Sequence, residues 1–484
     1  MPQDGMERPV DRRGNPDRLC VCIPVLTLTK MNPEPYPLRL HQHQAVARIT
    51  AAFNAGAKAF LDASEVGTGK TRSACVACKR DGWRVLVVAP LSTESGWFQE
   101  AATVGFQLQK METIRFNKGR RFVFPPTGNL WINYDQAIRF RDQIILDGKF
   151  DCVVFDESHK LKGRGTKRHK LWEALRCQGV RSLFLTATPG QDPLDMRYLA
   201  DVAGFNPFRF WQWVRGFRGI FQPPFAHGGY KYRPGFREDA EKLRALLSGP
   251  LALRRTPQDI AGWPELQRIM FPVPFTDREK IAYQRAFEDY LGQRATPLPT
   301  VAEKLVAVGQ FRMASSKLRV PYTVDLARTL IEQGRVVTIH CEYIEPAREI
   351  LMALAKVCVP GYIDGQTSAN DRRVILEKSA ADGFDALIFT VMEGINLHQL
   401  EDSHRQRVQI DHDVRWSGLM QHQVDGRTHR AGRNALVYWV YAPGTVEDRV
   451  LRVLRSRLET MNTLNSGISA DELVSIAFEK EPQI

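Results

Sequence analysis

The sequence predicts an α/β protein with two lobes, each built on a mainly parallel sheet flanked by helices. The first observation is a series of short apolar runs with the length of buried parallel strands: Ala59–Leu61, Val85–Ala89, Cys152–Phe155 and Ser182–Leu185. The second is that helical segments, such as Gln44–Asn54 and Thr71–Arg80, separate these runs. The third is a later series of the same kind: Val336–Ile339, Ala386–Phe389, Val408–Ile410 and Leu436–Tyr441. Alternating strands and helices indicate right-handed crossovers within each sheet.

The domain boundaries follow from changes in composition along the chain. Residues 1–37 are rich in Pro, Arg and Asp and predict an irregular N-terminal extension. Gly292–Thr300 carries two prolines and little periodicity, so the connection between the lobes is expected near it. We expect a first lobe over 38–272 with an aromatic and basic insertion near 205–250, a connecting segment over 273–316, and a second lobe over 317–484 that closes with a C-terminal helix.

Composition narrows the class of partner. Of 484 residues, 43% are hydrophobic and 25% charged, as in ordinary globular proteins. The formal net charge of +13 favours a polyanionic partner. No apolar run is long enough to span a bilayer, so no membrane partner is expected. The scattered cysteines suit a reducing compartment, and we expect a cytoplasmic protein of a bacterium or a virus-infected cell.

A glycine-rich segment predicts a phosphate site. Gly67, Thr68, Gly69, Lys70 and Thr71 lie between the first apolar run and a helical segment. Backbone N–H groups and the positive end of the helix supply donors for phosphate, and glycine lets the backbone come close. Lys70 would neutralise the β- and γ-phosphates of ATP, and the Thr71 hydroxyl would coordinate Mg²⁺. The full phosphate-loop pattern has Gly where this chain has Ser64, so a simple glycine-rich turn is the alternative.

An acidic pair follows the apolar run that ends at Phe155. We assign Asp156 to the magnesium shell and Glu157 to the attacking water, because nucleotidases need both roles at the end of a strand. His159 would relay the nucleotide state to the nucleic-acid side or only brace the loop.

Two arginines in the second half complete the predicted catalytic set. Gln423, Arg427 and Arg430 fall in one segment, and residues three apart share a helix face. Guanidinium groups suit a phosphoryl transition state whose charge spreads over three oxygens, and they would reach ATP across a cleft between the lobes. The alternative is that both arginines are surface residues of a basic helix.

Together these motifs resemble superfamily-two helicases, and most closely the Swi/Snf-type DNA translocases. The resemblance runs from about Leu38 to about Leu454. Further blocks carry it: Leu38–Gln42, Pro90–Thr93 with Trp97 and Glu100, Leu253–Thr256 with Asp259 and Pro264, Asp364–Thr367 with Arg372 or Arg373, Gly394–Leu397, Trp416, and Gly444–Asp448.

The resemblance implies two RecA-like lobes and an ATP-dependent motor that holds DNA by its backbone, independent of sequence, and works as a monomer. It implies that Gln42 reads the adenine and that Ser92, Thr93 and Asn396 lie on the DNA side. We add Lys162, because a basic run from Lys160 to Lys170 follows the acidic pair and could hold phosphates. A second segment, Phe208–Arg218, interleaves aromatic and basic residues, but packing is the favoured interpretation there.

The chain departs from the Swi/Snf pattern at several positions. Thr186–Pro189 contains Ala187 where the family has Gly, and Val391–Glu393 replaces a glycine-rich run. Arg433 follows Gly432 where the family usually has Gln, and Gly426 resembles the generic helicase form. Two alternatives therefore stay open: a DEAH-type RNA helicase, and a nucleic-acid-binding scaffold whose ATP site is inert.

Overall fold

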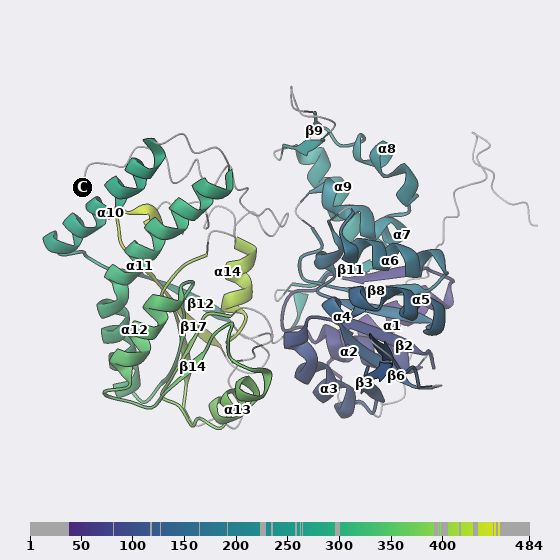
Figure 1. Ribbon diagram of the computed structural model, residues 1–484, viewed down its shortest axis with the longest axis horizontal. Coiled ribbons are helices and arrows are strands. Elements are labelled where there is room, and N and C mark those ends of the chain that lie inside the picture. The colour runs from purple at the N-terminus through teal and green to yellow at the C-terminus, as the bar shows by residue number, and fades with distance from the viewer. Residues whose placement is uncertain are drawn as a thin grey trace, which may run out of the picture. The chain divides into compact units, whose positions relative to one another are not determined.

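The computed structural model describes residues 38–454, except for 81, 117–118, 126, 164, 191, 223–228, 234–235, 257–258, 262, 264, 296–300, 392–394, 396, 398–404, 416–417, 429–433, 449 and 452–453. Two parallel sheets organise the described part, each covered by helices (Figure 1). The predicted fold class is confirmed.

The first sheet has seven strands, ordered β11-β1-β8-β7-β2-β6-β3, and every pairing in it is parallel. Its strands are β1 (Ala59–Asp62), β2 (Val85–Ala89), β3 (Leu108–Lys110), β6 (Asn129–Asn133), β7 (Cys152–Asp156), β8 (Arg181–Leu185) and β11 (Ala252–Leu253). β2 and the first four residues of β7 are fully buried, as expected for strands covered on both faces.

Helices cover both faces of this sheet. They are α1 (Leu40–Asn54), α2 (Lys70–Arg80), α3 (Glu94–Thr103), α4 (Tyr134–Arg139), α5 (Arg141–Asp147) and α6 (Lys167–Cys177). The chain moves one way across the sheet through α2 and α3, and back through α4, α5 and α6. Right-handed crossovers therefore place these two groups on opposite faces.

The aromatic and basic insertion is built largely by ring packing. It holds α7 (Ala200–Ala203), α8 (Phe210–Val214), the short pair β9 (Ile220–Phe221) and β10 (Lys231–Tyr232), and α9 (Arg237–Leu247). Trp213 stacks on Phe205 with ring centroids 4.4 Å apart and meets Phe217 edge-on at 4.8 Å. Phe208, by contrast, is 76% exposed. Most of these rings thus bury area in packing, as the favoured interpretation expects.

The second sheet has six parallel strands, ordered β12-β17-β16-β13-β15-β14. They are β12 (Leu266–Pro272), β13 (Val336–His340), β14 (Pro360–Ile363), β15 (Ala386–Phe389), β16 (Arg407–Asp411) and β17 (Ala435–Tyr441). The accompanying helices are α10 (Asp277–Ala295), α11 (Val301–Glu332), α12 (Ile344–Leu354), α13 (Ala369–Ala380) and α14 (Gly418–Asp425).

The change from one sheet to the other falls earlier than the sequence suggested. β12 lies inside the segment assigned to the first lobe, 38–272, yet it pairs along its whole length with β17 of the second sheet. The two helices α10 and α11 come between β12 and β13 in the chain, so the connection between the two sheets precedes β12. α11 also crosses the boundary expected at residue 317 without a break.

Parallel strands end at one edge of their sheet, and the predicted site residues of the first lobe gather at that edge. The phosphate segment follows β1, the acidic pair ends β7, and β8 lies between these two strands. None of the described helices is long and apolar enough to cross a membrane.

Candidate functional site

The phosphate segment forms a turn that runs directly into α2, which begins at Lys70. Gly67 and Gly69 have φ values of +85° and +79°, in the left-handed region that glycine adopts without strain. The Lys70 amine donates hydrogen bonds to the carbonyl oxygens of Ser64, at 2.7 Å, and Glu65, at 3.0 Å. The lysine thus curls over the loop, in position to exchange carbonyl oxygens for phosphate oxygens.

The start of α1 packs against this loop. A Cβ atom placed on Gly69 would collide with the end of the Gln42 side chain, which would have to move, and the positive φ of Gly69 also disfavours any other residue there. His41 Nε2 donates to the Thr68 carbonyl oxygen at 3.0 Å, and Arg255 donates to the backbone oxygen of His41. Gln42, whose role in reading adenine remains a prediction, is therefore buried beside the phosphate turn.

The acidic pair sits where β7 ends. Asp156 Oδ1 accepts a hydrogen bond from the Glu157 amide at 3.0 Å, and its Oδ2 accepts one from the Trp97 indole at 2.8 Å. Glu157 has φ +49° and ψ +50°, a left-handed conformation that is uncommon for a residue other than glycine. This turn separates the directions of two adjacent carboxylates, as two different roles require.

The surroundings shift the pKa values of the two carboxyl groups in opposite directions. Burial raises the pKa of Asp156 to about 6, with the negative charge of Glu157 adding to it. Burial also acts to raise the pKa of Glu157, but the His159 hydrogen bond and the charges of His159, Lys70 and Arg427 outweigh it, and the Glu157 pKa is lowered. Glu157 is thus kept as a charged base.

His159 ties the acidic pair to the segment after β8. Its Nδ1 lies 3.2 Å from Glu157 Oε2, 3.1 Å from the Thr186 hydroxyl and 3.3 Å from the Thr188 hydroxyl. These contacts support the interpretation that His159 braces the loop. They join the end of β7 to the end of β8.

The donor set suits a hard cation such as Mg²⁺. Asp156 is a buried carboxylate, and its raised pKa shows that little positive charge nearby compensates its own charge. Thr71 supplies a hydroxyl on the first turn of α2. Oxygen ligands of this kind are the ones that Mg²⁺ prefers. Asp156 and Thr71 would hold the ion, which would neutralise phosphate charge when bound.

In the second lobe, Gln423 lies on α14 and is half-buried, while Arg427 follows that helix and is 8% exposed. Arg427 Nη1 donates to the Ile395 carbonyl oxygen at 3.2 Å, and its own backbone oxygen accepts from the Leu397 amide at 2.9 Å. Arg427 is therefore not a surface residue of a basic helix. Its charge is also among those that lower the pKa of Glu157.

A buried polar network that the sequence reasoning missed anchors α14. Asp425 Oδ2 pairs with Arg268 Nε of β12 at 2.6 Å, and its Oδ1 accepts from Gln421 Nε2 at 2.9 Å. Gln421 also donates to Asp411 at the end of β16. Burial, together with the charge of Asp425, raises the pKa of Asp411 well above its ordinary value. Sequence spacing gave no signal for these contacts, which join residues up to 157 positions apart.

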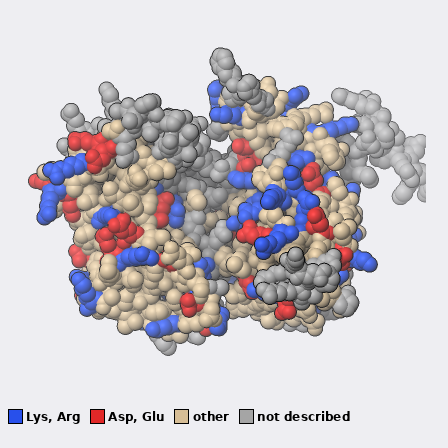
Figure 2. Space-filling model, viewed as in Figure 1, with Lys and Arg blue, Asp and Glu red and all other residues tan. Residues whose placement is uncertain are grey.

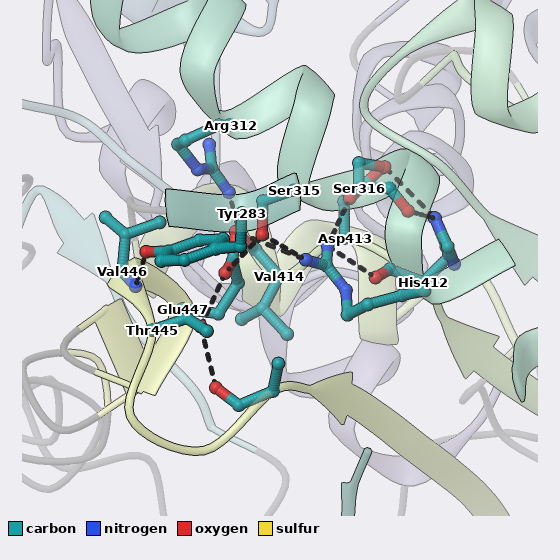
Figure 3. A network of polar contacts seen from close by, with 12 residues as sticks. Tyr283, Arg312, Ser315, Ser316, His412, Asp413, Val414, Thr445, Val446 and Glu447 are labelled. Carbon is teal, nitrogen blue, oxygen red and sulfur yellow. Dashed lines mark hydrogen bonds and ion pairs between the residues drawn. The ribbon is translucent and has the colours of Figure 1, made fainter. Parts of the chain in front are cut away.

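A second network, seen in Figure 3, fixes the segment between β16 and α14. Arg319 of α11 pairs with Asp413 at 2.7 Å and with Glu447 at 3.3 Å, and all three side chains are buried. His412 lies 3.0 Å from the Ser316 hydroxyl. The long helix α11 thus holds both this segment and the Gly444–Asp448 block, in which Glu447 lies.

Three of the four predicted nucleic-acid residues, Ser92, Thr93 and Lys162, lie on the first lobe. Ser92 and Thr93 form the short turn Leu91–Thr93, and the Thr93 hydroxyl donates to the Pro90 carbonyl oxygen at 2.9 Å. Lys162 lies 3.4 Å from Asp195, so part of its charge is already balanced. Figure 2 shows Lys and Arg gathered on this lobe, with acidic side chains between them.

Some predicted residues lie outside the described part of the chain. They are Arg430, Asn396, Gly394, Trp416 and Pro264, and their roles stay predictions.

Comparisons with known proteins agree with the resemblance drawn from the motifs. A family model described as "Type III restriction enzyme, res subunit" matches residues 35–191. The SWI/SNF-related matrix-associated actin-dependent regulator of chromatin subfamily A-like protein 1 of Xenopus tropicalis is 23% identical over 84% of this chain and 43% of its own length. A putative ATP-dependent RNA helicase of Acanthamoeba polyphaga mimivirus is 21% identical over 84% of this chain and 80% of its own length.

Among solved structures, the SWI2/SNF2 ATPase core of Sulfolobus solfataricus in complex with double-stranded DNA aligns with 92% of this chain and 96% of that one, at 17% identity and a TM-score of 0.38. The chain spans less than half the length of the frog relative. The sequence comparisons confirm the expected resemblance to superfamily-two ATPases of the Swi/Snf type.

Proposed function

We propose that this chain, a superfamily-two ATPase of the Swi/Snf type, hydrolyses ATP when bound to DNA and uses the hydrolysis to move along it. One observation carries the proposal: the Lys70 turn and the Asp156–Glu157 pair lie at the same edge of one parallel sheet. Ligands of α/β sheets bind at this edge. The charge of Arg427, from the other sheet's lobe, contributes at the same place.

The residues have separable roles in hydrolysis. Lys70 and the N–H groups at the start of α2 would hold the phosphates. Glu157, kept charged, would accept a proton from the attacking water. Arg427 and Arg430, with Gln423 beside them, would stabilise the charge that spreads over the transferred phosphoryl group. Mg²⁺, held by Asp156 and Thr71, would neutralise phosphate charge when bound.

DNA is the proposed polymer. The Pro90–Thr93 block with Trp97 and Glu100 matches the Swi/Snf pattern, and the frog relative is named as a regulator of chromatin. Ser92, Thr93, Lys162 and Asn396 would contact the sugar–phosphate backbone, which a motor must hold alike at every base step. We propose that a single copy of the chain suffices.

Steady-state ATP hydrolysis tests the proposal. Purified full-length protein with magnesium should release phosphate faster with duplex DNA than without it, and the Lys70→Ala variant should not. Phosphate release equal to that of Lys70→Ala under every condition would instead favour an inert scaffold.

The RNA helicase alternative has a named relative in its favour, the putative viral RNA helicase. The same assay separates the two, because stimulation by RNA that exceeds stimulation by duplex DNA would replace DNA as the polymer. A triplex-displacement assay beside a strand-separation assay would then distinguish movement along the duplex from unwinding.

A further inference from the structure

Helix α3 connects the proposed DNA-contacting turn to both halves of the phosphate site. The turn Leu91–Thr93 runs without interruption into α3, which begins at Glu94. Trp97 and Glu100 lie one and two turns further along the same helix. A helix is stiff over this length, so a displacement or ordering of the turn moves both side chains.

Trp97 contacts the acidic pair. Its side chain is 1% exposed, and its indole Nε1 donates a 2.8 Å hydrogen bond to Oδ2 of Asp156. Asp156 has its other oxygen bound to the Glu157 amide, so the indole fixes the direction of the carboxylate. A donor aimed at a buried carboxylate forms a charge-assisted hydrogen bond, which is stronger than a neutral one.

Glu100 contacts the helix that follows the phosphate turn. Its Oε2 pairs with Arg72 Nε at 2.6 Å, and both side chains are only about one-third exposed or less. Arg72 comes directly after Thr71, the second residue of α2. One helix therefore contacts the carboxylate at the end of β7 and the helix that begins with Lys70.

We propose that α3 transmits DNA binding at Leu91–Thr93 to the phosphate site, and that Trp97 is the positioning residue that holds Asp156. The inference rests on the proposed function and adds the route by which DNA accelerates hydrolysis. Bound DNA fixes the turn, the turn fixes α3, and α3 sets the Asp156 carboxylate and the first turn of α2 for catalysis. Trp97 is buried and acts through Asp156, so we class it as a positioning residue and not as a catalytic one.

The chain offers a matched control for Trp97. Trp131 of β6 is also fully buried, and its indole nitrogen has no hydrogen-bond partner among the described residues. W97F and W131F each remove one indole N–H and keep an aromatic ring. Only W97F removes the hydrogen bond to Asp156.

The experiment measures hydrolysis with and without saturating duplex DNA for wild type, W97F and W131F as full-length proteins. Losing a hydrogen bond to a charged group corresponds to a loss of about tenfold or more in rate if it acts in the stimulated state. W97F should lose about that factor in DNA stimulation, with a smaller loss of basal rate. W131F should match wild type in both.

Two binding measurements accompany the rates. The affinity for a fluorescently labelled duplex should be the same in all three proteins, because the turn itself is unchanged. W97F should need more Mg²⁺ than W131F to bind a fluorescent ADP analogue, since the carboxylate is less well held. Equal unfolding temperatures of W97F and W131F would show that the difference is not a general loss of stability.

Three results would overturn the inference. W97F could show the same ratio of DNA-stimulated to basal rate as W131F. W97F could also lose the basal and the stimulated rate by the same factor. Either result would make Trp97 a structural support alone. W97F could also lose DNA affinity, which would mean that Trp97 supports the DNA-contacting turn itself and not only Asp156. If no nucleic acid stimulates the wild type, the proposed function fails and the inference with it, whereas a failure of W97F alone leaves the proposed function standing.

Discussion

The two lobes hold their parts of the site by different means. In the first lobe, Lys70 begins α2 and Glu157 directly follows β7, and their neighbours in sequence supply the turns that orient them. In the second lobe, Arg427 depends on a buried framework in which Arg268, Asp425 and Asp411 come from distant elements. A locally encoded site tolerates changes elsewhere, whereas a site held by a buried network is sensitive to any member of that network.

The sharpest way to test the second lobe's share is Arg430→Ala. An arginine acting on the transition state contributes about 10³–10⁵ in rate in related NTPases, so hydrolysis should fall by a factor in that range. Nucleotide affinity, measured with a fluorescent ATP analogue, should stay nearly constant. Arg433→Ala, in the same basic segment, is the control and should behave as wild type. A loss confined to nucleotide binding would contradict the transition-state role.

Glu157→Gln tests the first lobe's share. Removing a general base lowers the rate by about 10²–10⁴, while the amide keeps the size of the side chain. Single-turnover hydrolysis should slow by a factor in this range, and ATP should still bind. Unchanged turnover would show that another group activates the water.

Asp425→Ala tests whether the second lobe's network supports the fold as well as the chemistry. The substitution removes a hydrogen bond between charged groups, which contributes about 1.5–3 kcal/mol, and the partly exposed Arg268 is left without its carboxylate. Urea unfolding should show a loss of that size, accompanied by slower hydrolysis. Asp277→Ala, which removes an exposed carboxylate at the start of α10, should leave both nearly unchanged. Full stability in Asp425→Ala would mean that the framework is dispensable.

Lys162→Ala should have the smallest effect. If Lys162 neutralises one backbone phosphate, the slope of log affinity against log salt should fall by about one, without a change in sequence preference. Lys280→Ala removes a lysine from α10 and controls for net charge. An identical salt dependence in both variants would exclude Lys162 from the DNA surface.

The sequence predicts the fold class and the first lobe's site well because both depend on patterns of residues that are close together in the sequence. Val85–Ala89 and the end of β7 were placed by apolar runs, and Lys70 by its glycines. The start of α1 at Leu40, four residues before the predicted Gln44, was missed because His41 and Gln42 are polar yet buried against the phosphate turn. These two residues are buried because they contact the phosphate turn, and the hydrophobic periodicity of the sequence does not reveal such a contact.

Contacts between distant segments explain the other differences. β12 shows no regular alternation of buried and exposed residues, and only its pairing with β17 assigns it to the second sheet. The Trp97 indole meets a carboxylate 59 positions away, and the sequence offered Trp97 only as a family motif. Such contacts are set by how elements fold back on one another, so they become visible only in three dimensions.

The close fit between Gly69 and Gln42 has a consequence for nucleotide choice. Because the glutamine amide occupies the space where a side chain at 69 would begin, any substitution there must push Gln42 aside. If Gln42 reads the adenine, as the family resemblance implies, then phosphate binding and the discrimination among bases cannot vary independently. A related chain that hydrolyses a different nucleoside triphosphate would therefore need coordinated changes at the phosphate turn and at position 42.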